Sequence, residues 1–140
     1  MNIEANKNAR AYAKAETTID ATASKVYNTI ADINRWPEWQ SAVSSAKLEG
    51  KLEEGVTFNW KANGMKIKSK LHTVEKNSAI GWTGKMFWIK AIHNWRFTEE
   101  NGTTKVIVEE SMSGFGSSMM RKTLRKGMEL NLIELKDRVL

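Results

Sequence analysis

Apolar and polar residues alternate between residues 43 and 112, which is the period-two pattern of β-strands with one buried face. The pattern predicts strands near 43–49, 56–61, 65–75, 79–86, 89–99 and 103–112. An earlier stretch alternates in the same way and predicts a first strand at 10–19, with small residues along one face. We therefore expect seven strands.

Two stretches change to the helical period. The first predicts a short helix, with Asp20, Thr22 and Ser24 as competing N-caps, followed by the apolar positions Val26, Tyr27, Ile30 and Ile33. Pro37 marks the end of this helix or the start of another short one. The last stretch predicts a long helix at about 117–139, with one apolar stripe: Met120, Leu124, Met128, Leu132, Leu135 and Val139.

The turn signals organise the strands into hairpins. Asn63-Gly64 and Asn101-Gly102 predict two-residue type I′ turns, because both central residues of that turn need a positive φ. Residues 76–78 predict a third turn. Strands and helices that occur in separate blocks predict an α+β fold with an antiparallel sheet. We expect the sheet to curve around the final helix, which is the only element long enough to cover its concave face.

Composition narrows the class of protein. A chain of 140 residues predicts a single domain, 1–140, and 41% hydrophobic residues are typical of a soluble globule. The absence of cysteine excludes disulfide scaffolds, thiolate zinc sites and thiol catalysis. No segment approaches the roughly 18 apolar residues of a membrane span. The first ten residues lack the apolar run of a signal peptide, so we expect a cytoplasmic protein without a membrane span.

The net charge of +6 is unevenly distributed, because residues 61–96 contain eight Lys and Arg and a single acidic residue, Glu75. The lysines at 66, 68 and 70 alternate, as solvated positions on one strand face do. No zinc-finger spacing or phosphate loop accompanies them, so we expect no nucleic-acid binding. The last helix has a basic side formed by Arg121, Lys122, Arg125 and Lys126. This side is either a solvated face, or it attracts an anionic head group or a membrane surface.

Alternation also assigns the inward face of the sheet. Six tryptophans indicate either a Trp-rich solid core or a wide internal surface around a ligand. The inward positions are mostly aromatic and aliphatic with few polar groups, as in small-molecule sites. Thr73 falls on this face, whereas His72 falls on the outer face and is predicted to be solvated. We expect the ligand-binding residues to be Phe58, Trp60, Ile67, Trp82, His93, Trp95, Val108, Glu110, Met120 and Leu124.

His93 and Glu110 are the candidate catalytic residues. A two-residue loop at Asn101-Gly102 places them directly opposite each other, with Cβ atoms about 5 Å apart. Such a pair can carry out general acid–base chemistry, or it can be a satisfied pair in the core. The two histidines fall on opposite predicted faces and no Gly-x-Ser-x-Gly motif occurs. We therefore expect no metal site, no catalytic triad and no cofactor.

Several segments resemble the START-like superfamily, or SRPBCC group, which includes polyketide cyclase/dehydrase-like proteins and the birch-pollen-allergen fold. The segments are Ile19-Asp20-Ala21, Val26-Tyr27, Ile30-Ala31-Asp32, Trp36-Pro37-Glu38-Trp39, Trp95-Arg96-Phe97, Asn101-Gly102-Thr103, Val106 to Glu109 and Ser111-Met112-Ser113-Gly114. Tyr27 departs from the pattern, since many relatives have tryptophan there. The resemblance implies a helix-grip fold, in which a curved seven-stranded antiparallel sheet, two short helices and a long C-terminal helix enclose a hydrophobic cavity.

Three hypotheses for function follow. The first is a protein that binds an apolar or amphipathic small molecule, lipid-, sterol- or polyketide-like, between the sheet and the final helix. The second is a cyclase/dehydratase-type enzyme that uses His93 and Glu110 as acid and base. The third is an interaction module that uses the basic outer face of the sheet. Neither the ligand nor the oligomeric state follows from the sequence, and the fold alone does not decide whether there is catalysis.

Overall fold

Seven strands form one antiparallel sheet in the computed structural model, which describes residues 2–140. The sheet order is β1-β7-β6-β5-β4-β3-β2, so every neighbour except the β1–β7 pair is consecutive in the chain. The prediction of seven antiparallel strands is confirmed, with each strand end within two residues of its expected position. The strands are β1 (Ala11–Ile19), β2 (Val43–Leu48), β3 (Thr57–Ala62), β4 (Met65–Glu75), β5 (Ala79–Met86), β6 (Ile89–Glu100) and β7 (Thr103–Gly114).

The helices lie where the apolar spacing places them: α1 (Ala23–Ala31), η1 (Ile33–Glu38), η2 (Ser117–Met120) and α2 (Arg121–Val139). Thr22 is the N-cap of α1, and its hydroxyl accepts a hydrogen bond from the backbone N–H of Lys25. Pro37 lies inside the 3₁₀ helix η1. The long helix begins with the 3₁₀ turn η2 and continues as α2, so the predicted range 117–139 contains two elements.

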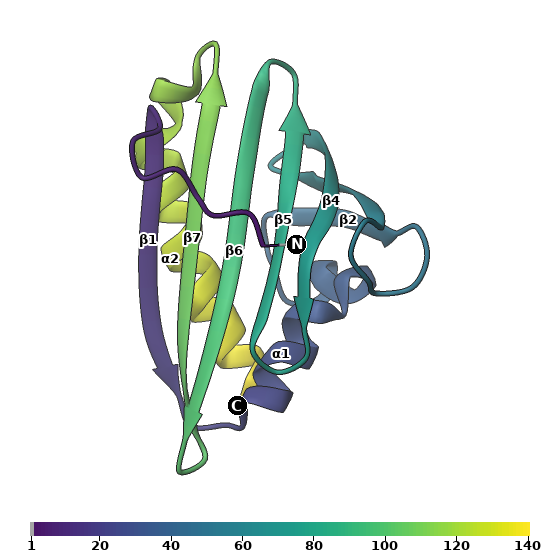
Figure 1. Ribbon diagram of the computed structural model, residues 1–140, viewed down its shortest axis with the longest axis vertical. Helices are drawn as coiled ribbons and strands as arrows, with labels where there is room; N and C mark the ends of the chain where they lie inside the picture. Colours follow the sequence, from purple (N-terminus) through teal and green to yellow (C-terminus); the bar gives the residue numbers. More distant parts are fainter. Residues whose placement is uncertain (1) are drawn as a thin grey trace.

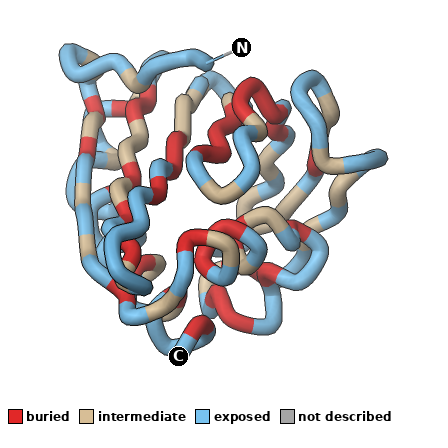
Figure 2. The backbone as a smooth tube through the Cα atoms, turned by 60° about the horizontal axis from the view of Figure 1, so that its bottom comes forward, coloured by how far each residue is buried: buried red, intermediate tan, exposed pale blue. Residues whose placement is uncertain are grey.

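The long helix α2 crosses one face of the sheet, and α1 and η1 lie on that same side (Figure 1). Buried positions alternate with exposed ones along the strands and recur once per turn on the helices (Figure 2). The predicted apolar stripe of α2 is buried from Leu124 to Val139, whereas Met120 is half-buried at the start. Apolar burial between helix and sheet is the main stabilisation of such a two-layer domain.

Both Asn-Gly turns have the backbone that the sequence predicts. The φ angles are 51° at Asn63 and 78° at Gly64, and 54° at Asn101 and 78° at Gly102. The second turn fixes the β6–β7 register, in which Phe97 faces Val106 and Trp95 faces Val108. A turn also occupies 76–78, as expected.

A bulge in β4 overturns one prediction. Leu71 pairs with Trp82, but the next pair joins Thr73 to Gly81, so the register shifts at His72. Beyond the bulge the faces exchange, which moves Thr73 from the predicted inner face to the outer one, where its hydroxyl contacts His72 Nδ1 at 2.7 Å. Alternation alone cannot reveal an inserted residue.

The segment 2–10 crosses the outer face of the sheet (Figure 1). The backbone N–H of Ile3 donates to His72 Nδ1 at 3.2 Å, and Asn94 Nδ2 donates to the carbonyl of Ile3 at 2.7 Å. The N–H of Asn6 donates to Ser111 Oγ. His72 is therefore buried under this segment, and the prediction that it is solvated is wrong.

Candidate functional site

A row of cross-strand neighbours forms the polar centre of the inner face. Trp82 of β5 pairs with His93 of β6, which pairs with Glu110 of β7. The indole and imidazole rings are stacked, with centroids 4.7 Å apart and planes inclined by 3°. His93 Nδ1 is hydrogen-bonded to Glu110 Oε1. The structure thus confirms that His93 and Glu110 face each other on the inner side of the sheet.

The hydrogen bond between the two groups decides what His93 presents to its surroundings. Only 16% of the His93 side chain and 12% of the Glu110 side chain are exposed. With a Glu110 carboxylate oxygen as the acceptor, Nδ1 carries the hydrogen and donates a hydrogen bond to Glu110. The other ring nitrogen, Nε2, is buried and has no hydrogen-bond partner among the described residues. An orienting carboxylate and a free Nε2 are the arrangement in which histidine exchanges protons with a bound molecule.

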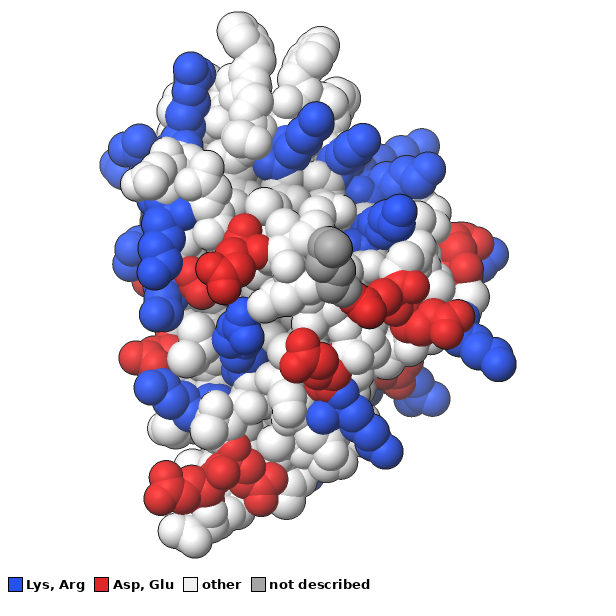
Figure 3. All heavy atoms as spheres, viewed as in Figure 1, with Lys and Arg blue, Asp and Glu red and all other residues white. Residues whose placement is uncertain are grey.

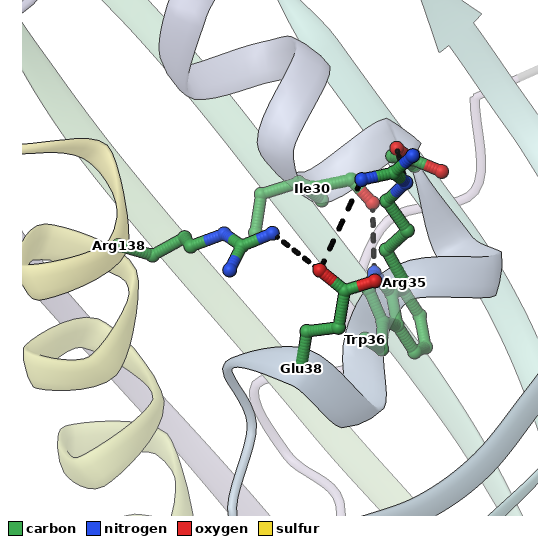
Figure 4. Close-up of polar contacts among 6 residues, drawn as sticks. Ile30, Arg35, Trp36, Glu38 and Arg138 are labelled. Carbon is green, nitrogen blue, oxygen red and sulfur yellow. Dashed lines mark hydrogen bonds and ion pairs between the residues drawn. The ribbon is translucent and has the colours of Figure 1, made fainter.

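Three further tryptophans differ in how their indole N–H groups are used. Trp36 Nε1 donates to the carbonyl of Ile30 at 2.9 Å (Figure 4), and Trp60 Nε1 donates to Ser69 Oγ at 3.0 Å. Trp95 Nε1 is buried and has no partner in the described part of the chain, although the residue is only 2% exposed. A buried donor without a partner is unfavourable unless another molecule supplies an acceptor.

These groups line a cavity of about 170 Å³ between the sheet and α2. Its surface contains every residue that the sequence assigned to ligand binding except Phe58, which is fully buried behind the wall. There Phe58 packs edge-to-face on Trp36 and Trp82, with centroids 5.4 and 5.5 Å away. The predicted residues that line the cavity are Trp60, Ile67, Trp82, His93, Trp95, Val108, Glu110, Met120 and Leu124.

The sequence did not single out the row on α2 that borders the cavity. Thr123, Gly127 and Asn131 recur every four residues, and all three line the cavity. A Cβ atom at Gly127 would meet no heavy atom within 4 Å, so this glycine leaves open space rather than allowing a close approach. Asn131 Nδ2 donates to Gln40 Oε1 at 2.8 Å and closes the row at its C-terminal end. The predicted stripe of this helix consists of apolar positions only, so it does not include this row.

The C-terminal half of α2 is anchored to the short helices. Arg138 Nη2 contacts Glu38 Oε1 at 2.8 Å, and Arg35 approaches the same carboxylate (Figure 4). Glu134 accepts a hydrogen bond from the backbone N–H of Ser41. At the other end of α2, Arg121 Nε donates to the carbonyl of Arg10. The helix that forms one wall of the cavity is therefore hydrogen-bonded to the rest of the fold at both ends, with more contacts at its C-terminal half.

Trp88 contradicts the idea that all six tryptophans line an internal surface. It is 76% exposed, in the turn between β5 and β6, and Phe87 beside it is 80% exposed. Within residues 2–140, no group of three or more His, Cys, Asp or Glu is placed to hold a metal ion. In the same residues, no helix combines the length and the hydropathy of a membrane span.

The fold and the cavity define a class: a curved antiparallel sheet that holds a long C-terminal helix, with an apolar chamber between them, is the helix-grip fold. The sequence matches the family described as "Polyketide cyclase / dehydrase and lipid transport" over residues 10–140. The chain belongs to this family.

Solved structures show the same fold at low sequence identity. A hypothetical protein from Helicobacter pylori superposes with a TM-score of 0.85 and 15% identity, over 96% of this chain and 90% of that one. A START superfamily protein from Mycobacterium smegmatis gives 0.78 and 12%, over 91% and 96%. The structure described as Ara h 8.0201 gives 0.75 and 14%, also over 91% and 96%. A comparison with curated proteins found no significant match.

Proposed function

We propose that the protein binds an apolar or amphipathic small molecule in the cavity between the sheet and α2. The observation that carries this proposal is the cavity itself, whose wall is mostly aromatic and aliphatic. Two of its lining residues, Trp95 and His93, each have a buried ring nitrogen without a partner among the described residues. Apolar walls with a few convergent polar groups are typical of small-molecule sites. The family description, which includes lipid transport, supports the same function.

The volume limits the ligand. A cavity of about 170 Å³ is close in size to the apolar cavities of about 150 Å³ that accept benzene. One or two fused rings, or a short acyl segment, fill it. We expect a complete sterol to extend beyond it. We therefore infer that the bound portion is a mono- or bicyclic ring system, such as one end of a polyketide-like molecule.

The buried donor specifies a polar feature of the ligand. The indole N–H of Trp95 needs an acceptor, and the rings of Trp95 and His93 are neighbours, with centroids 5.7 Å apart. We expect the indole of Trp95 to turn toward a carbonyl oxygen on the ring system and donate to it, beside His93. The two polar groups thus favour a cyclic ketone or quinone over a pure hydrocarbon.

A matched pair of ligands tests this function. The bicyclic ketone 1-tetralone and its hydrocarbon counterpart tetralin have nearly the same shape, and only the ketone has an acceptor. We expect both to bind, and the ketone to bind about five-fold more tightly, since one neutral hydrogen bond contributes about 1 kcal/mol. Titration calorimetry and the rise in melting temperature measure the two affinities, because a ligand of the native state stabilises it.

Two variants separate the hydrogen bond from the cavity. Trp95→Phe keeps the ring but removes the N–H, and we expect it to abolish the preference for the ketone while tetralin still binds. Trp39→Phe is the control, because Trp39 does not line this cavity. If neither ligand binds the wild-type protein, the cavity is part of the core and the proposal is wrong.

A second candidate function rests on the free Nε2 of His93. Cyclisation and dehydration of polyketides begin with removal of a proton beside a carbonyl, and a histidine held by a carboxylate is suited to that step. In this mechanism Nε2 takes a proton from the carbon next to the ketone, and Trp95 Nε1 donates a hydrogen bond to the oxygen that gains negative charge. The family description, which also includes cyclase and dehydrase, supports this candidate.

The same ketone tests the enzyme. In D₂O, a general base at His93 accelerates exchange of the protons beside the carbonyl of 1-tetralone, which proton NMR follows directly. We expect His93→Gln and Glu110→Gln to lose the acceleration while circular dichroism shows an intact fold. A double replacement by apolar residues of similar size, His93→Leu with Glu110→Met, is expected to fold. If exchange in the wild-type protein equals that in buffer, the protein is a binder and not an enzyme of this type.

A further inference from the structure

Residues 2–140 contain three two-residue hairpin turns, and one of them has an unexpected composition. Ala62 pairs with Met65 and Glu100 pairs with Thr103, so Asn-Gly forms the turn at both places. Met86 pairs with Ile89, which leaves Phe87-Trp88 as the turn between β5 and β6. Two-residue turns strongly favour Asn and Gly, and the positive φ of this turn falls on a bulky aromatic residue, Phe87.

The backbone of this turn is strained by its composition. Phe87 has a φ of 53°, in the left-handed region that bulky residues rarely adopt. The strain is not compensated by burial, because 80% of Phe87 and 76% of Trp88 are exposed. Neither turn chemistry nor core packing explains these two residues. A contact with another surface is the remaining reason to place large aromatic rings here.

A second segment extends the exposed apolar surface. Phe115 is 83% exposed and Met119 is 84% exposed, in the connection between β7 and α2. This connection lies against the turn, because a Cβ atom at Gly114 would be 2.1 Å from the carbonyl oxygen of Trp88. Gly114 has a φ of 107°, so both its conformation and its contact require glycine. We refer to Phe87, Trp88, Phe115 and Met119 as the apolar tip.

Cations border the apolar tip. Lys85 and Lys90 flank the turn in sequence, and Arg121 and Lys122 follow Met119, with all four exposed. No acidic residue occurs in 76–98 or in 111–128. In the described part of the chain, no salt bridge neutralises any of the four. Figure 3 shows uncharged side chains projecting at the top of the molecule, with Lys and Arg beside them.

The apolar tip lies beside the cavity. Met86 precedes the turn and Met112 precedes the connection to α2, and both line the cavity. Met120, next to Met119, lines it as well. A surface that the apolar tip contacts is therefore adjacent to one end of the ligand site.

We propose that the apolar tip docks the protein on an anionic lipid bilayer. Tryptophan and phenylalanine partition into the head-group region of a membrane, and lysine and arginine beside them are attracted to anionic lipids. A protein partner would be met by a groove or a flat face, but these side chains project from the end of two loops. Nucleic acid explains the cations but not four projecting apolar side chains.

Co-sedimentation with vesicles tests the proposal with the full chain. The probes are phosphatidylcholine vesicles with and without about 30% phosphatidylglycerol. We expect binding to the anionic vesicles, and weaker binding as salt increases. The decisive variant is Phe87→Asn with Trp88→Gly, which installs the residue pair that the chain uses in its other two-residue turns. Folding is preserved by better turn chemistry, and the affinity for anionic vesicles falls about ten-fold or more.

Matched controls assign the effect to the apolar tip. Lys85→Gln with Lys90→Gln is expected to weaken binding about five-fold per lysine, whereas Lys25→Gln with Lys136→Gln at the other end leaves it unchanged. Ile133→Ser, an exposed apolar residue on the C-terminal half of α2, is the apolar control. The proposal is overturned if wild-type protein ignores anionic vesicles or the turn variant binds them equally well. Tip-dependent binding of an RNA oligonucleotide, or a tip-dependent dimer by size-exclusion chromatography, without vesicle binding also overturns it.

Discussion

The two ends of the sheet carry two-residue hairpin turns of different composition and backbone. At the end with the β6–β7 turn, Asn101 and Gly102 adopt the positive φ angles that this turn requires. The polar side chains near this turn form hydrogen bonds with other parts of the fold. Thr103 donates to Asp20 Oδ1 at 3.1 Å, and Glu99 accepts from the backbone N–H of Ala23 at the start of α1. At the other end, Phe87 has a strained backbone with a positive φ, and no salt bridge among residues 2–140 pairs the neighbouring cations. One end is built for stability, and the other carries features that stability does not require.

The strongest test of this comparison exchanges the residues of the two turns and measures the free energy of unfolding. Asn101→Phe with Gly102→Trp puts bulky residues at two positions of positive φ, and we expect a loss of about 2–3 kcal/mol. The reverse exchange, Phe87→Asn with Trp88→Gly, is expected to leave the free energy of unfolding unchanged or raise it by up to about 1 kcal/mol. Chemical denaturation measures both. Equal losses at the two turns would show that Phe87 and Trp88 contribute to folding after all.

Charged residues at the two ends are expected to differ in their effect on stability, by less than the turns do. Glu99 accepts a hydrogen bond from the N–H of Ala23, which has no partner within α1. Glu99→Ala is therefore expected to lower the free energy of unfolding by about 1 kcal/mol. Lys85→Gln with Lys90→Gln at the opposite end is expected to change stability by less than about 0.5 kcal/mol. The contrast disappears if both variants unfold at the same denaturant concentration as the wild-type protein.

Gly127 tests whether the open side of α2 serves access to the cavity. Gly127→Ala is expected to stabilise the protein by about 1 kcal/mol, because the methyl group meets nothing and helix propensity improves. Gly127→Phe places a ring at the border of the cavity, and we expect slower association of 1-tetralone in stopped-flow fluorescence. Unchanged association in Gly127→Phe would mean that the ligand enters elsewhere.

The smallest expected effect concerns Tyr12, whose hydroxyl donates to Glu109 between β1 and β7. Burial, and then the hydrogen bond and the charge of Glu109, raise the pKa of Tyr12 to about 12. Burial also raises the pKa of Tyr27. A raised pKa favours the protonated form in the folded state, so this stabilisation is complete below pH 10 and decreases as the pH rises toward 12. Ultraviolet titration is expected to show little tyrosinate in the native protein at pH 10, and Tyr12→Phe to remove one transition. A transition of both tyrosines near pH 10 in the folded protein would contradict this.

The sequence predicted the parts of the fold that local chemistry determines. Asn101-Gly102 fixes the register of β6 and β7, and this register alone places His93 opposite Glu110. The apolar stripe of α2 identified which helix face meets the sheet. Nearly all residues assigned to the cavity follow from these two facts and from alternation.

The remaining features depend on contacts that have no periodic signal. The bulge at His72 adds one residue without changing the composition of β4, so Thr73 was placed on the wrong face. The segment 2–10 covers His72 through backbone hydrogen bonds, which side-chain patterns do not encode. Trp88 was counted with the internal tryptophans, because aromatic residues in a two-residue turn are an exception that only the structure shows.

The indole N–H signals of the six tryptophans test the distinction between cavity and apolar tip in one NMR experiment. A Trp→Phe variant at each position assigns the signals. We expect 1-tetralone to shift the Trp95 signal most, because its unpaired N–H gains an acceptor, and to leave the Trp88 signal in place. Anionic vesicles are expected to form a short-lived complex with the protein and to broaden the indole N–H signal of Trp88 selectively. If 1-tetralone moves Trp88 instead of Trp95, or moves no indole signal, the cavity is not the ligand site.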